Sequence, residues 1–176
     1  MGAERSTLFG WRWVAQDWQR NRGNPKFLIF LTYFRASQAL SKAPAVPRGL
    51  AWLVDLSYRL ISEGVFGVEL PLKTRVGSGL RIFHGFGLVV NDGAVLGSDV
   101  TLRNGVVIGH RFAGGPLPVF GNRVDVGAAS IILGGIHIGD DASVGAGAVV
   151  LHDVPAGAAA VGNPARMSLK RTRDVM

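Results

Sequence analysis

A repeat of six residues runs through the middle of the chain. Apolar side chains recur at every sixth position in two series, Val76, Ile82, Leu88, Ala94, Val100 and Val106, then Phe120, Val126, Ile132, Ile138, Val144 and Val150. Neither an α-helix nor an alternating strand has a period of six. A period of six is typical of a solenoid in which each six-residue unit forms one flat side and one turn. Three such units close a triangular coil around the repeated apolar side chain. The pattern predicts an all-β parallel β-helix from about Glu69 to Pro155.

The two series are out of step between Val106 and Phe120, where the spacing is 14 residues instead of 12. A two-residue excess at this point predicts a loop, at about residues 110–118, that leaves the prism. Loops on a rigid scaffold often carry binding residues.

The first 66 residues have the pattern of helices instead. An amphipathic helix is predicted behind Pro47, with a stripe formed by Leu50, Leu53, Val54, Ser57, Leu60 and Ile61. An earlier helix is expected over about residues 26–40, and a shorter one contains Trp11, Trp13 and Trp18. The domain organisation is thus an α-helical segment at 1–66, a β-helix at 67–160 and a basic tail at 161–176.

Composition and charge narrow the class of protein. An apolar content of 48% in 176 residues indicates one folded domain, or a domain with an appendage, and the absence of cysteine excludes thiolate chemistry. The longest apolar run, residues 27–34, is shorter than the ~20 residues that span a bilayer. No signal peptide is evident, so we expect a cytoplasmic protein, free or at the inner face of the plasma membrane.

The net charge of +7 is concentrated at the ends of the chain. Residues 1–63 hold nine basic against four acidic side chains, whereas residues 76–155 hold four against six. Because the centre is acidic and no nucleic-acid-binding motif accompanies the charge, we expect no nucleic-acid partner. The basic helical segment is predicted to pack on the β-helix or on a neighbouring subunit, or alternatively to rest on a membrane surface.

Five segments carry a resemblance to a known family. They are residues 82–91 (IFHGFGLVVN), 99–109 (DVTLRNGVVIG), 127–136 (GAASIILGGI), 144–150 (VGAGAVV) and 161–166 (VGNPAR). In order and spacing, residues 69–165 resemble the catalytic domain of serine O-acetyltransferases. They are more similar still to colanic-acid-type exopolysaccharide acetyltransferases of the same hexapeptide-repeat superfamily. The resemblance implies a left-handed β-helix, a homotrimer or a pair of trimers, and acetyl-CoA as co-substrate, with no metal.

The same resemblance assigns catalytic roles. His84 occupies the position of the general base, and Glu69, fifteen residues earlier, occupies that of the carboxylate that orients it. An imidazole can accept the proton of a hydroxyl at neutral pH, and a carboxylate stabilises the imidazolium that forms. A backbone N–H can then stabilise the oxyanion formed at the thioester. Without a nucleophilic cysteine, direct transfer is expected.

For acetyl-CoA, the family threads the pantetheine arm between subunits along small residues. The matching positions are Gly109, Ala128 and Ala146, and Arg166 and Lys170 are the candidates for the coenzyme phosphates. All five are also compatible with a purely structural or solvated role.

The residues of the predicted loop at 110–118 indicate which class of acceptor the enzyme uses. His110 and Arg111 are candidate substrate contacts, since a loop histidine is the base in other branches of the superfamily. Serine acetyltransferases carry an Arg-His pair before a loop proline, where this chain has Pro116 and Leu117. Because neither can bind a carboxylate, a neutral glycan is the expected acceptor.

Three other functions remain open at this stage. One is serine acetylation for cysteine biosynthesis. Another is a zinc hydratase resembling gamma-class carbonic anhydrases, although the four histidines lack the close ligand spacing such a site needs. The third is a scaffold that only trimerises.

Overall fold

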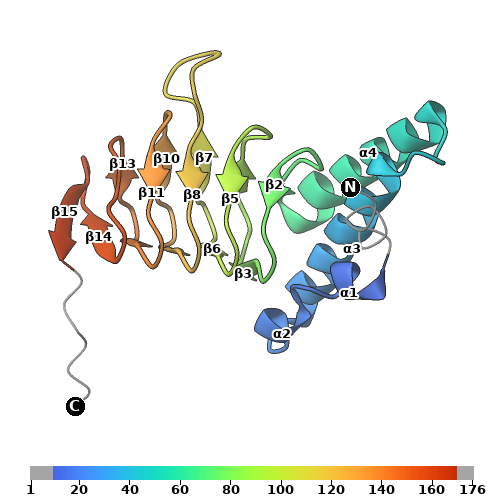
Figure 1. The fold of residues 1–176 in the computed structure, drawn as a ribbon, viewed down its shortest axis with the longest axis horizontal. Coiled ribbons are helices and arrows are strands. Elements are labelled where there is room, and N and C mark those ends of the chain that lie inside the picture. The colour runs from blue at the N-terminus through green and yellow to red at the C-terminus, as the bar shows by residue number, and fades with distance from the viewer. Residues whose placement is uncertain (1–9, 170–176) are drawn as a thin grey trace, which may run out of the picture.

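Three sheets, parallel except for their last strand β15, surround one apolar prism, and helices cover its N-terminal end (Figure 1). The computed structural model describes residues 10–169. Successive strands pass from sheet to sheet, so that the first sheet has the order β1-β4-β7-β10-β13, the second β11-β8-β5-β2 and the third β15-β14-β12-β9-β6-β3. We call them sheets A, B and C. The predicted fold class, a parallel β-helix behind an α-helical segment, is confirmed.

The strands are short, as a triangular coil requires. Their bounds are β1 Val68–Glu69, β2 Arg75–Val76, β3 Arg81–Phe83, β4 Leu88–Val90, β5 Val95–Leu96, β6 Thr101–Arg103, β7 Val107–Gly109, β8 Val119–Phe120, β9 Asp125–Val126, β10 Ile131–Leu133, β11 His137–Ile138, β12 Ser143–Val144, β13 Val149–Val150, β14 Ala158–Val161 and β15 Arg166–Leu169.

The six-residue series point into the prism as predicted. Of the twelve side chains in the two series, eleven are at most 3% exposed, and Val76 in the first coil is half-buried. Strand pairing shows where the series change phase. Ile82 pairs with Leu102, twenty residues on, whereas Val89 pairs with Val107, eighteen residues on. The two extra residues therefore lie in the corner between β3 and β4, which contains His84.

The predicted loop has a different length from the expected one. Val107 pairs with Ile131, twenty-four residues on, so the connection between β7 and β8 adds six residues to a coil instead of two. Because six residues preserve the phase of the repeat, this insertion leaves the register of the later coils unchanged. The connection, residues 110–118, projects from the solenoid (Figure 1).

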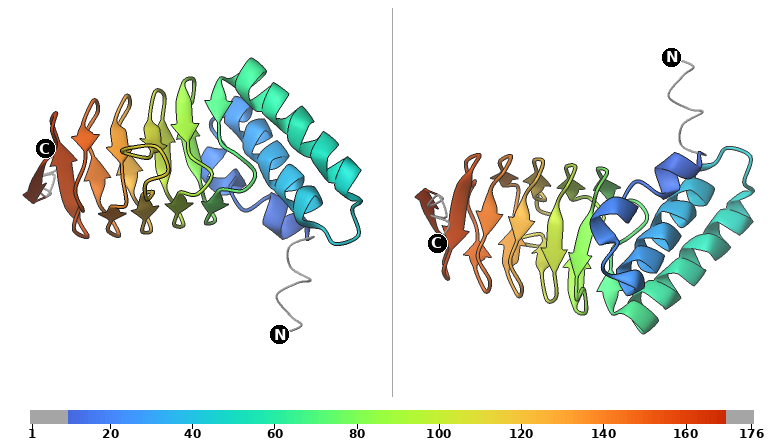
Figure 2. Two further views of the ribbon diagram at one scale, coloured as in Figure 1. Left: turned by 90° about the horizontal axis from the view of Figure 1, so that it is seen from above. Right: turned by 90° about the horizontal axis from the view of Figure 1, so that it is seen from below.

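The helical segment stacks on the first coil, with two longer helices side by side (Figure 2). After α1 and α2 the chain forms the longer α3 and α4, and a π-helical turn, η2, leads into β1. Their bounds are α1 Trp11–Val14, α2 Trp18–Asn21, α3 Pro25–Lys42, α4 Arg48–Ile61 and η2 Ser62–Phe66. Buried aromatic side chains of α3, among them Phe27, Phe30 and Phe34, extend the core of the prism.

The apolar stripe predicted for α4 is mostly outside the core. Leu50, Leu53 and Leu60 are each more than half exposed, and in α4 only Tyr58 is buried. The helix packs on α3 through its Tyr58 side, and these leucines lie on its exposed side. Contact of this face with another subunit or a membrane stays a prediction. Within residues 10–169, no helix is long and apolar enough to cross a bilayer.

The described part of the expected basic tail contains a strand. Residues 166–169 form β15, which pairs antiparallel with β14 and places Arg166 opposite Val161. The part of the expected tail that begins at Lys170 lies outside the described residues.

Candidate active site

The corner between β3 and β4 exposes an imidazole. His84 is exposed and has a left-handed backbone, with φ of 51°, which is uncommon for a residue with a side chain. The amide of Phe86 donates to the His84 carbonyl at 2.6 Å, closing a tight turn. Between them, Gly85 is required: a Cβ there would lie 2.5 Å from Ile82 and 2.8 Å from the ring of Phe27. The two extra residues of the first coil thus turn His84 outward.

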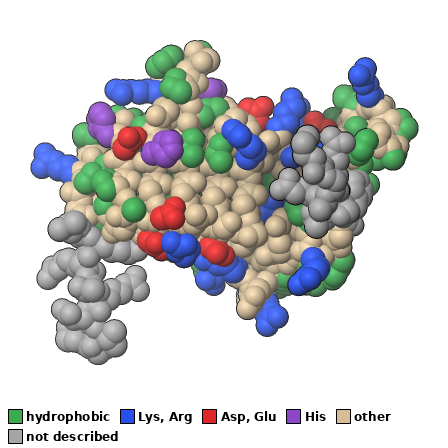
Figure 3. Space-filling view, in the orientation of Figure 1, with side chains coloured by type: hydrophobic (Ala, Val, Ile, Leu, Met, Phe, Trp, Pro, Cys, Tyr) green, Lys and Arg blue, Asp and Glu red, His purple; other side chains and the backbone are tan. Residues whose placement is uncertain are grey.

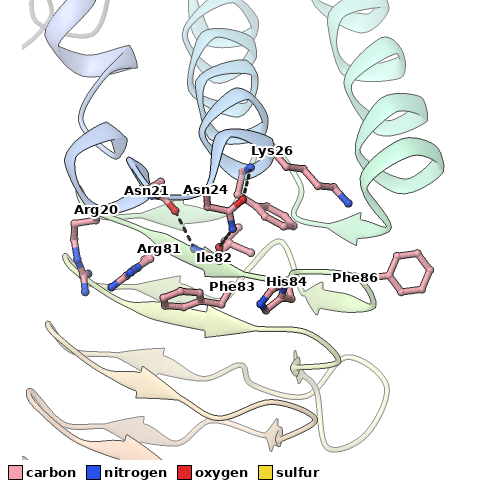
Figure 4. A pocket seen from close by; sticks show the side chains of 11 residues that line it. Arg20, Asn21, Asn24, Lys26, Arg81, Ile82, Phe83, His84 and Phe86 are labelled. Carbon is pink, nitrogen blue, oxygen red and sulfur yellow. Dashed lines mark hydrogen bonds between the residues drawn. The ribbon is translucent and has the colours of Figure 1, made fainter.

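His84 lines a cavity of about 510 Å³ between this corner and the start of α3 (Figure 4). Two asparagines hold the cavity wall in place. Asn21 donates to the Leu80 carbonyl at 2.8 Å and accepts from the Ile82 amide at 3.3 Å. Asn24 caps α3 by accepting from the Phe27 amide at 3.4 Å, and it donates to the Ile82 carbonyl at 3.4 Å. Because β3 is the edge of sheet C, these amides satisfy backbone groups that a further strand would otherwise pair.

The predicted partner Glu69 lies elsewhere on the surface. It is exposed on the outer face of sheet A, in register with Val89, and lines a separate hollow of about 290 Å³ beside Tyr58 and Arg59. Within residues 10–169, Glu69 and His84 form no hydrogen bond. Their pairing therefore stays a prediction.

The small residues expected along the coenzyme arm occupy both edges of sheet A. Ala128 and Ala146 lie in the same corner of successive coils, where the Gly147 amide donates to the Ala128 carbonyl at 2.8 Å. Gly109 ends β7 at the opposite edge of the sheet. Arg166 is exposed on β15.

The base of the extruded loop packs on two glycines. Leu117 and Pro116 lie 2.7 Å and 2.6 Å from where a Cβ would stand at Gly93 and Gly135, so larger residues would displace the loop. His110, at the start of the loop, has a buried Nδ1 without a hydrogen-bond partner among the described residues.

Arg111 is exposed, with its Cβ 3.6 Å from the Cβ position of Gly134. The loop leaves the corner between sheets A and B, whereas His84 occupies the corner between sheets C and A. In one protomer the two therefore lie at opposite edges of sheet A.

Figure 3 shows histidine side chains with an acidic side chain between two of them, and a separate group of acidic and basic side chains along the lower edge of this face. Near the loop, the His137 amide donates to Asp153 at 2.7 Å. Elsewhere Arg123 pairs with Asp141 at 2.7 Å, which raises the pKa of Arg123. In the described part of the chain, no three histidine or acidic side chains gather as metal ligands would.

Most residues of the cavity could not be predicted from the sequence. Arg20, Lys26, Arg81, Phe83 and Phe86 all line it with His84. Two of them, Arg20 and Lys26, flank the segment 21–25, whose pattern indicates only a break between helices. The one available signal was that Arg81, Phe83 and Phe86 lie close to His84 in sequence.

Comparisons with known proteins place this arrangement in a family. Serine acetyltransferase of Helicobacter pylori strain 26695 is 44% identical over 159 residues, which cover 89% of this chain and 93% of the relative. The putative colanic acid biosynthesis acetyltransferase WcaB of Escherichia coli K12 is also 44% identical, over 141 residues covering 80% and 83%. Soybean serine acetyltransferase superposes with a TM-score of 0.75 at 32% identity, covering 89% of this chain and 67% of that one. No family model matches.

The fold and the comparisons together define an acyltransferase built on a β-helix of hexapeptide repeats. More narrowly, the chain belongs to the acetyltransferase family that contains the serine acetyltransferases and WcaB. The expected family, its left-handed β-helix fold and the enzymatic class are thereby confirmed.

Proposed function

We propose that this protein transfers acetyl from acetyl-CoA to a sugar hydroxyl of an exopolysaccharide or its precursor, with His84 as general base. The observation that carries the proposal is the exposed imidazole at an enlarged corner, opening into a cavity of about 510 Å³. Such a cavity has the size of a small-molecule site.

The chemistry needs only groups that the chain supplies. The His84 imidazole takes the proton of the acceptor hydroxyl while its oxygen attacks the thioester carbonyl. The tetrahedral intermediate then collapses, the carbon–sulfur bond breaks, and the imidazolium returns the proton to the leaving thiolate. Glu69 would orient the imidazole if it reaches the second ring nitrogen in the assembled enzyme.

The cavity lining favours a sugar over an amino acid. A free amino acid presents an ammonium group, which proteins usually pair with a carboxylate. The described lining contains no Asp or Glu side chain, and it offers the aromatic rings of Phe83 and Phe86. Phe86 is 73% exposed, which suits contact with the apolar face of a sugar ring.

A trimer would complete the site. On the outer face of sheet A, four β-branched side chains stand in register, namely Val89, Val107, Ile131 and Val149. The corresponding ladder on sheet C contains Arg81, Thr101, Asp125 and Ser143 instead. Of these two faces, sheet A is therefore the better suited to contact another copy. Packing one protomer against the next would bring the loop corner of one beside the His84 corner of its neighbour, with Gly109 and the pantetheine arm between them.

Serine acetylation is the second candidate. It is supported by the Helicobacter pylori relative, whose identity of 44% equals that of WcaB. The two functions differ in the acceptor and share the chemistry at His84.

One experiment tests both candidates. Release of CoA from acetyl-CoA is measured with L-serine, with neutral oligosaccharides and with sugars linked to phosphate or diphosphate. We expect turnover with a sugar and none with L-serine; saturable turnover with serine alone would overturn the glycan acceptor. His84→Ala should lower kcat by about 10²–10⁴-fold. His152→Ala, an exposed histidine outside the cavity, is the matched control and should leave kcat unchanged.

Glu69→Gln separates orientation from binding. An orienting carboxylate predicts a lower kcat with little change in KM for either substrate. Unchanged kinetics would remove Glu69 from the mechanism and leave His84 in place.

A further inference from the structure

The cavity beside His84 is lined by cations on more than one element. Arg20 belongs to α2, Lys26 to the first turn of α3 and Arg81 to β3, and the described lining contains no acidic side chain. Resting on the proposed function, we infer that the acceptor carries a phosphate or diphosphate group that the positive charge of this cavity binds, with Arg81 at one end of the cavity and Lys26 towards the other, while the hydroxyl lies at His84.

Arg20 is the cation least available to a ligand. Its guanidinium donates to the Gly79 carbonyl at 2.9 Å and lies 3.6 Å from the carboxylate of Asp99. These contacts hold Arg20 against the first coil and partly offset its charge. Arg20 therefore adds positive charge to the cavity wall, but its N–H donors are less available to a ligand than those of the other two cations.

Arg81 and Lys26 are differently placed. Neither has an ion-pair partner within residues 10–169. The guanidinium carbon of Arg81 lies 4.1 Å from the ring centroid of Phe83, so the arginine is stacked and its in-plane N–H donors remain available for a planar, bidentate contact. The Lys26 ammonium lies 5.5 Å from the ring centroid of Phe27 and 5.8 Å from that of Phe66.

The helix that bears Lys26 adds to the positive potential. α3 is 18 residues long, and its N-terminal turn opens onto the cavity behind the cap residue Asn24. The N-terminal end of a helix carries a partial positive charge that favours a nearby anion. A phosphate in the cavity would therefore meet side-chain charge and helix dipole together.

The geometry assigns this anion to the acceptor and not to the coenzyme. Figure 4 shows Arg20 and Arg81 at one end of the cavity, the Lys26 ammonium towards the other, and His84 between Phe83 and Phe86. The thioester of acetyl-CoA must reach His84, and the pantetheine arm separates the thioester from the coenzyme phosphates by its whole length. A coenzyme in position for transfer thus holds its own phosphates outside this cavity.

The site is tested with inorganic pyrophosphate as the probe, using calorimetry on the full chain at low ionic strength. We expect Arg81→Gln and Lys26→Gln each to weaken pyrophosphate binding by about tenfold or more, the effect of losing a charge-assisted hydrogen bond. Arg75→Gln is the matched control, because Arg75 is exposed on β2 of the same coil and does not line the cavity. Circular dichroism verifies that each variant is folded.

The outcomes distinguish this inference from the proposed function. Absence of binding, or equal weakening by all three variants, overturns the anion site even if neutral sugars are acetylated. Specific binding without CoA release from any sugar overturns the proposed acetylation and leaves an anion site. Acetylation that pyrophosphate inhibits competitively against the acceptor supports both.

Two acceptors then identify the source of the anion. UDP-glucose represents a nucleotide-linked sugar, and a short prenyl-diphosphate-linked glucose in detergent represents a lipid-linked one. For whichever is acetylated, Arg81→Gln should raise the acceptor KM about tenfold and leave the KM for acetyl-CoA unchanged. An equal rise in both KM values would contradict the assignment to the acceptor.

Discussion

Arg35 and Asp17 form an ion pair in which both side chains are only 1% exposed. The Arg35 Nε lies 2.7 Å from Asp17 Oδ2, and Nη2 lies 3.2 Å from Oδ1. Arg35 also donates to the carbonyls of Val76 and Gly77, and Asp17 accepts from the amide of Leu80. Every strong hydrogen-bonding group of the pair is therefore used to fasten α3, and the turn before α2, to the first coil. Because the same elements form the cavity wall, the pair positions the site.

Removing one partner of this pair should be costly. Asp17→Ala leaves the Arg35 guanidinium buried without its counter-charge, which we expect to lower the free energy of unfolding by about 3–5 kcal/mol. Urea denaturation measures this change. Glu63→Ala is the control, since its contact with Arg59 is exposed, and should cost no more than about 0.5 kcal/mol. Equal effects of the two substitutions would show that the buried pair has no special role.

Stability at alkaline pH should depend on Tyr58. Burial raises the pKa of Tyr58 well above its ordinary value, and its hydroxyl donates to the Leu70 carbonyl at 2.8 Å. The folded state thus holds this proton when the unfolded chain, with a tyrosine pKa of about 10, has begun to lose it. The contribution of protonated Tyr58 to the free energy of unfolding is complete below about pH 10. It declines as the pH rises further towards the pKa of Tyr58 in the folded state.

Tyr58→Phe tests the sign of this dependence. The variant should lose about 1–3 kcal/mol at neutral pH, because the Leu70 carbonyl is left unsatisfied, but its stability should fall less steeply above about pH 10. Tyr33→Phe, whose hydroxyl contacts Ser57 at the surface, should keep the steep decline. A parallel pH dependence in Tyr58→Phe and the wild type would contradict the prediction.

Because successive coils are closely spaced, any side chain at position 127 should destabilise the fold. A Cβ there would lie 2.4 Å from the backbone nitrogen of Ala146 and 2.6 Å from the carbonyl carbon of Gly145, and neither can rotate away. Gly127→Ala is expected to cost about 1–3 kcal/mol and to lower the melting temperature. Gly49→Ala, on an open face of α4, should instead match or exceed the wild type. If Gly127→Ala left the melting temperature unchanged, the coils would be able to separate locally.

The aliphatic ladder on sheet A should control assembly. Ile131→Glu places a charge in the middle of the proposed contact, so we expect light scattering to show a trimer for the wild type and separate protomers for the variant, with loss of acetyl transfer. Ser143→Glu, on the outer face of sheet C, should leave both mass and activity unchanged. Retention of the trimer by Ile131→Glu would exclude sheet A as the interface.

The six-residue repeat was sufficient to predict the β-helix, because every unit must place one apolar side chain inward and then turn. The repeat did not predict correctly where the two series change phase. From the sequence, the shift between Val106 and Phe120 was attributed to a two-residue excess in the loop. Strand pairing shows a loop insertion of six residues and the two extra residues at the His84 corner. The spacing of apolar positions gives the number of extra residues, but only the strand pairing shows at which corner they leave the coil.

The sequence by itself was enough to predict the coil, the side chains that point into it and His84 as the candidate base. These features depend on residues that are close together in the chain. Only the tertiary structure decided what surrounds that imidazole. Lys26 and Arg81 are 55 residues apart in the chain and line one cavity because Arg35 and Asp17 fasten α3 to the first coil. The amphipathic stripe of α4 likewise predicted a helix but not its buried side, because burial depends on the space that the prism and α3 leave.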